Sequence, residues 1–198
     1  MSTPRTGNRS VRAAGACGIA SAVLVLASPG VPAENIALPL WMLGWLLLLP
    51  FLAAVAGLAR DAGGRATSVA PAIPAAGAVL VALHLVTVGI EHTANGLSES
   101  SPAHEPLHEV GSALFSLGML PFGVALVAAA VAVRALPRWL AGAALAVGLL
   151  SVVNGTVVGT ESAWGFLLST VWVFVAGVTL AVRGARVAPE REPELATL

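Results

Sequence analysis

The sequence predicts an all-α membrane protein, a polytopic helix bundle with six transmembrane helices and both termini in the cytoplasm. Of its 198 residues, 57% are hydrophobic and only 10% are charged, whereas charged residues make up about a quarter of a soluble domain. The hydrophobic residues form continuous runs, most of them close to the roughly 20 residues that a helix needs to cross a bilayer. All ten basic residues are arginines, and they fall in alternate connections between these runs.

Six apolar runs define a membrane domain over residues 13–182. The spans are expected at residues 13–28, 36–59, 69–90, 110–133, 139–158 and 163–182. Residues 1–12 and 183–198 are polar tails, the second of them expected to be disordered, and residues 91–109 form the longest connection. The first run is the shortest, and its basic start also fits a cleaved signal peptide, which would leave five spans in the same orientation.

The charges predict the orientation of the chain. With the N-terminus in the cytoplasm, every arginine lies on the cytoplasmic side, as the positive-inside rule requires. Six glutamates then lie on the outer side, namely Glu34, Glu91, Glu99, Glu105, Glu109 and Glu161. We therefore expect a multi-pass protein in the cell membrane of a bacterium, surrounded by the lipid bilayer, with membrane protein partners or a homo-oligomer left open. Nucleic-acid binding would need a basic face, which this charge pattern does not provide.

The long connection over residues 91–109 carries most of the candidate chemistry. It holds three of the four histidines, His92, His104 and His108, and four of the ten acidic residues. With Glu105 and Glu109, these histidines offer the imidazole and carboxylate ligands that bind transition metal ions such as zinc, copper or nickel. Clustered His and Glu side chains would also change charge between pH 5 and 7, so pH sensing is an alternative. A solvated acidic loop with no ligand is a third.

The string His104-Glu105-Pro106-Leu107-His108 matches H-E-x-x-H. In zinc proteases this spacing works because one continuous helix puts both histidines on one face, beside the catalytic glutamate. If Pro106 begins the fourth helix, His104 lies outside it and the shared face is lost. The sequence therefore favours a protein that is not an enzyme and that binds a metal ion or senses pH at its outer loop. An intramembrane metalloenzyme with Glu105 as the base is an alternative.

His84 is the ionisable residue that lies deepest in a predicted span, and such residues are candidates for function. Glu91 follows two helical turns later on the same face, so the pair would line one cavity that opens outward. Asn154 in the fifth run is a further polar candidate. The alternative function is thus a small-solute carrier with a cavity near His84. Simple hydrogen bonds to neighbouring helices would also explain His84 and Asn154.

Tryptophans mark the expected membrane interfaces. Trp41 and Trp45 lie one turn apart near the start of the second run, and Trp139 follows the turn that contains Pro137 and Arg138. The glycine-rich fourth run, the RALPRW turn and the sequence WLAGAALAVGLL resemble bacterial six-helix membrane proteins grouped as a domain of unknown function. The resemblance covers residues 110–158. It implies the six-helix architecture and supplies no catalytic motif.

Overall fold

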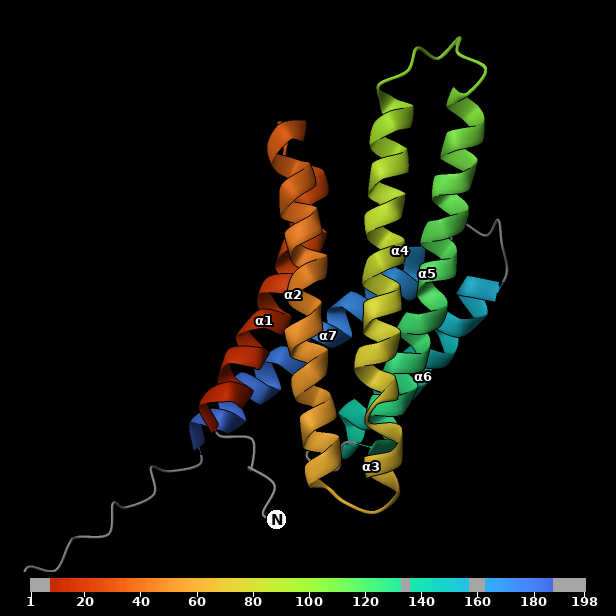
Figure 1. Cartoon of the computed structure of the whole chain (residues 1–198). Coiled ribbons are helices and arrows are strands. Elements are labelled where there is room, and N and C mark those ends of the chain that lie inside the picture. The colour runs from red at the N-terminus through yellow and green to blue at the C-terminus, as the bar shows by residue number, and fades with distance from the viewer. Residues whose placement is uncertain (1–7, 133–135, 157–162, 187–198) are drawn as a thin grey trace, which may run out of the picture.

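The computed structural model describes residues 8–132, 136–156 and 163–186, and its elements in these ranges are all helical (Figure 1). Six of the described helices are long and apolar enough to cross a membrane. This confirms the predicted all-α fold. The elements in chain order are α1 (Asn8–Ala27), the 3-10 turn η1 (Ser28–Gly30), α2 (Glu34–Asp61), α3 (Arg65–Val69), α4 (Ala72–Asn95), α5 (His104–Ala132), α6 (Arg138–Thr156) and α7 (Ala163–Arg186).

The bundle is built around the antiparallel pair α4 and α5, which are joined at the top of Figure 1 by a short connection. Helix α2 packs against α4, and α6 packs against α5. Helix α1 lies along α7, so the first and last helices of the chain are neighbours and close the bundle (Figure 1). The bundle is therefore held together by helices that follow each other in the chain and by the contact between α1 and α7.

The two ends of the bundle differ in charge. The start of α1, the α2–α3–α4 turn, the start of α6 and the end of α7 lie at one end, and η1 and the α4–α5 connection lie at the other (Figure 1). Three exposed arginine side chains are described, and all belong to the first end: Arg12, Arg60 and Arg138. The described carboxylates of the second end are Glu91, Glu99, Glu105 and Glu109, and Asp61 lies at the first end beside Arg60. The charge separation predicted from the sequence is thus present in the described residues.

The connection between α4 and α5 is shorter than the predicted loop over residues 91–109. Helix α4 continues to Asn95, and α5 begins at His104. The apolar run ends near Ile90, but helix α4 continues to its C-cap residue, Gly96. The N–H of Gly96 donates to the His92 carbonyl at 3.2 Å. The candidate residues therefore lie on the ends of two packed helices, where their directions are fixed.

Glycines let the helices approach closely, as small residues do in membrane bundles. A Cβ on Gly15 of α1 would lie 2.6 Å from the backbone nitrogen of Ala181 on α7. A Cβ on Gly148 of α6 would lie 2.9 Å from the carbonyl oxygen of Gly123 on α5. Because these neighbours are backbone atoms, they cannot move aside without shifting a helix.

Helices α6 and α7 are also joined by hydrogen bonds. The Ser151 hydroxyl donates to the Val147 carbonyl at 2.9 Å, and Ser169 donates to Ser151 across the interface at 2.8 Å. The Trp172 indole N–H donates to the Leu140 carbonyl at 3.0 Å. Such bonds contribute on average about 0.6 kcal/mol each in a membrane.

The close approach of α5 and α6 predicts that Gly148→Ala lowers the free energy of unfolding by about 1–3 kcal/mol, because the added methyl group has no room. Gly142→Ala on the same helix is the matched control, since no atom lies within 4 Å of a Cβ placed there. The control should be neutral or gain up to about 1 kcal/mol of helix propensity. Denaturant unfolding of the two variants in detergent measures the difference, and equal stabilities would contradict this packing.

Candidate functional site

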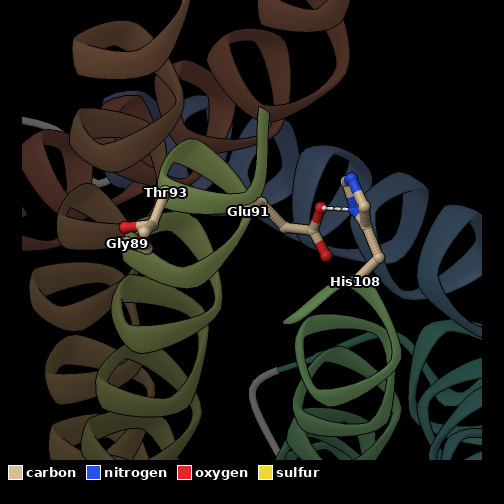
Figure 2. A network of polar contacts seen from close by, with 4 residues as sticks. All are labelled: Gly89, Glu91, Thr93 and His108. Carbon is tan, nitrogen blue, oxygen red and sulfur yellow. Dashed lines mark hydrogen bonds and ion pairs between the residues drawn. The ribbon is translucent and has the colours of Figure 1, made fainter. Parts of the chain in front are cut away.

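Glu91 near the end of α4 and His108 near the start of α5 are hydrogen-bonded across the helix pair (Figure 2). The His108 Nδ1 and Glu91 Oε2 atoms are 2.7 Å apart, and the two side chains are 36% and 32% exposed. Gly111 on α5 provides the space for this bond, because a Cβ there would overlap the Glu91 carboxylate. The structure thus places Glu91 against α5 as the partner of His108.

His104 and His108 lie on one face of α5. Their ring centroids are 4.7 Å apart and the rings meet edge to face. The expectation that Pro106 separates them is wrong, because α5 begins at His104 and Pro106 occupies its first turn. A proline is tolerated there, since the N–H groups of a first turn have no partner within the helix. The helical context of the H-E-x-x-H spacing is therefore present.

The bond to Glu91 determines which nitrogen of His108 is available. An ionised carboxylate only accepts hydrogen bonds, so Nδ1 carries the proton and donates it to Glu91. In the neutral imidazole, Nε2 then keeps its lone pair, and it lies on the side of the ring away from Glu91 (Figure 2). A histidine held in this way by a carboxylate is the form that commonly ligates a metal ion.

The other predicted metal ligands do not join this pair. His92 is exposed and lines a cavity on the α2 side of α4, while Glu105 and Glu109 are exposed on α5. Within the described ranges, no group of three or more His, Cys, Asp or Glu side chains is placed to hold one metal ion. The five residues proposed from the sequence are thus divided between two helices, and the histidines that meet are His104 and His108.

A cavity of about 270 Å³ lies between η1, α2 and α4. It is named the outer cavity because the sequence predicts that this end of the bundle faces outward. Ser28 and Trp41 form part of one wall, and Glu91, His92 and Asn95 form part of the other. The predicted cavity included His84 and Asn154, but neither lines this one. The carrier hypothesis therefore has a cavity with Glu91 in its wall, and this cavity does not reach His84.

His84 is fully buried among aromatic rings. Its ring centroid lies 3.9 Å from that of Trp45 and 5.1 Å from that of Phe115. Nδ1 is 2.9 Å from the Leu80 carbonyl and donates to it, whereas Nε2 has no hydrogen-bond partner in the described part of the chain. A Cβ at Gly118 would overlap this imidazole, so the glycine makes room for it.

Trp45 corrects an expectation from the sequence. It is 2% exposed and covers His84, so it does not belong to an interfacial belt, although its neighbour Trp41 lines the outer cavity. Asn154 lies where α6 meets α7, and a Cβ at Gly165 would be 2.8 Å from its Nδ2 atom. Asn154 is thus placed between two helices and away from the outer cavity.

Sequence reasoning missed Trp45, Gly111 and Gly118. One signal for the glycines was present, because they lie seven residues apart on α5, as His84 and Glu91 do on α4. In an antiparallel helix pair, equal spacings can face each other. No comparable signal identified Trp45.

The Glu91–His108 contact predicts a measurable coupling. A double-mutant cycle of Glu91→Ala and His108→Ala should give about 0.5–1 kcal/mol, a small value because both side chains are about one-third exposed. The control cycle pairs Glu91→Ala with Arg138→Ala, because Arg138 is exposed at the start of α6, at the opposite end of the bundle. Its coupling should stay within roughly 0.3–0.5 kcal/mol. Unfolding in detergent gives both values, and equal couplings would argue against the contact.

Comparison with known proteins adds no family. No family model, curated protein or solved structure matches the chain. The resemblance of residues 110–158 to six-helix membrane proteins stays a prediction.

Proposed function

We propose that this membrane protein binds a transition metal ion at the end of the α4–α5 pair, through the Nε2 atoms of His104 and His108. The observation that carries the proposal is the 2.7 Å bond from His108 to Glu91. It fixes the ring of His108 and leaves Nε2 as an acceptor directed away from α4. A carboxylate in this role typically raises metal affinity by about 10- to 100-fold.

The two imidazoles are suitably related for a shared ion. Histidines four residues apart on a helix present both rings to one metal, which is the principle of the H-E-x-x-H spacing. The 4.7 Å between the ring centroids shows that the side chains already adopt neighbouring positions. Solvent completes the coordination, because both residues are partly exposed.

The ligand chemistry indicates the class of metal. Neutral imidazole nitrogens suit Zn²⁺, Cu²⁺ and Ni²⁺, whereas Mg²⁺ and Ca²⁺ prefer carboxylate, carbonyl and water oxygens. Glu105 and Glu109 lie on the same turns of α5 and raise the local concentration of cations. Protons compete for the same ring nitrogens, so acidification should release the ion. This links the metal-binding and pH-sensing hypotheses.

A binding role is favoured over hydrolysis. Catalytic zinc sites use three protein ligands and keep one position open for water. The described residues bring two histidines together without a third ligand of this kind. We therefore infer binding, sensing or transfer of the ion, without a catalytic role for Glu105.

The membrane orientation follows from the charges. The arginines belong in the cytoplasm by the positive-inside rule, and the histidine-bearing end then lies on the outer side of the cell membrane. The site would meet metal ions from outside the cell.

Purified protein in detergent should bind Zn²⁺ or Ni²⁺ in calorimetric titrations, and His104→Ala or His108→Ala should weaken binding by at least about tenfold. Glu91→Ala should weaken it by about tenfold, since the positioning carboxylate is lost. Glu91→Gln should have a smaller effect, because its amide oxygen still accepts the Nδ1 proton.

His92→Ala is the matched control, since this histidine lies on the cavity side of α4. It should keep the wild-type affinity. Equal losses in His92→Ala and His108→Ala would remove the proposed ligand pair, and an affinity unaffected by His104→Ala and His108→Ala together would end the proposal.

The orientation has its own test. A single cysteine introduced at Ser100, in a Cys17→Ala background, should react in intact cells with a thiol reagent that does not cross membranes. A cysteine at Ala62, in the turn after α2, should react only after lysis. Labelling in the reverse pattern would place the histidines in the cytoplasm.

A further inference from the structure

A small internal cavity lies among α1, α2, α5 and α7, apart from the outer end of the bundle. Its volume is about 10 Å³, and every residue that lines it is at most 4% exposed. One water molecule needs roughly 10–15 Å³ on this measure, so the space is at the lower limit for a single water. A larger ligand does not fit.

The wall of this cavity is mostly apolar but includes two hydroxyl-bearing residues, Ser21 of α1 and Thr170 of α7. The Thr170 hydroxyl donates to the Phe166 carbonyl at 2.8 Å. Its oxygen therefore keeps lone pairs that can accept a hydrogen bond. An apolar cavity of this size would stay dry, but polar partners allow a water to bind.

Trp45 of α2 also lines the cavity, and its indole nitrogen has no hydrogen-bond partner in the part of the chain that the structure describes. Burying an N–H without an acceptor costs about 1–3 kcal/mol. Trp172 shows the usual outcome, because it is equally buried, at 3% exposure, and donates to the Leu140 carbonyl. Trp45 therefore both lines the small cavity and carries the unpaired N–H donor.

We propose that one water molecule occupies this cavity, accepts the N–H of Trp45 and donates to the hydroxyl oxygens of Thr170 and Ser21. Three partners are the usual number for a buried water. The water links α1, α2 and α7, because it bridges the Trp45 indole N–H to two hydroxyl oxygens with which this N–H makes no direct hydrogen bond. The site is independent of the proposed metal site.

Nuclear magnetic resonance on ¹⁵N-labelled protein in detergent tests this proposal. The chain has five tryptophans, and the indole signal of Trp45 is assigned by its loss in Trp45→Phe. A magnetisation-transfer cross-peak from water to the Trp45 indole proton is expected. The Trp172 indole is the matched control and should show none, because its proton is bonded to a carbonyl.

The double variant Ser21→Ala with Thr170→Val makes the cavity wall apolar apart from Trp45, and it should lose the cross-peak. An unchanged Trp172 signal in this variant reports that the bundle is intact. A cross-peak that persists in the double variant overturns the assignment, as does its absence from the wild-type protein. Loss of the cross-peak in His84→Leu alone would place the water on His84 Nε2 and would also overturn it.

Discussion

The antiparallel contact between α4 and α5 positions two ionisable side chains of α4, those of His84 and Glu91, and it depends on glycines. Glu91 faces Gly111, and His84 faces Gly118, so each bulky side chain meets a position without a Cβ. The two pairs are two helical turns apart on both helices, which fixes one register. A shift of one residue would place a side chain against each of these groups.

This register also explains the outer end of the pair. With Gly111 beside it, the Glu91 carboxylate turns toward α5 and reaches His108. The neighbouring His92 lines the outer cavity, as Glu91 also does. Glu91 therefore contributes both to the contact with α5 and to the wall of the cavity.

The spans could be predicted from the sequence because their number depends on the length of apolar runs, which is local information. Their ends could not, because α4 and α5 continue through polar residues until Gly96 and the segment before His104. The end of an apolar run does not mark the end of the helix that contains it. The predicted loop therefore contained residues that lie on helices. Because α5 begins at His104 and not at Pro106, the sequence argument against a shared face for His104 and His108 does not hold.

The candidate site was predictable as a set of residue types and not as a set of contacts. Three histidines in one segment indicated a metal site, but a single sequence does not show that His92 faces α2 while His108 faces Glu91. The same limit applies to Trp45, since its place one turn from Trp41 suggested a common interface. The packing register between neighbouring helices decides which helix a given face contacts. This register depends on residues that are far apart in the sequence.

His84 shows what such an interior position costs. Its Nδ1 proton is satisfied by the Leu80 carbonyl within α4, but Nε2 is buried with no partner among the described residues. An unpaired acceptor of this kind costs about 1–3 kcal/mol. The tilted ring contact with Trp45 and the edge contact with Phe115 offset part of this cost, since aromatic pairs contribute about 0.5–1.5 kcal/mol each. An apolar side chain of similar volume would carry no such cost, so stability alone does not explain a histidine at this position.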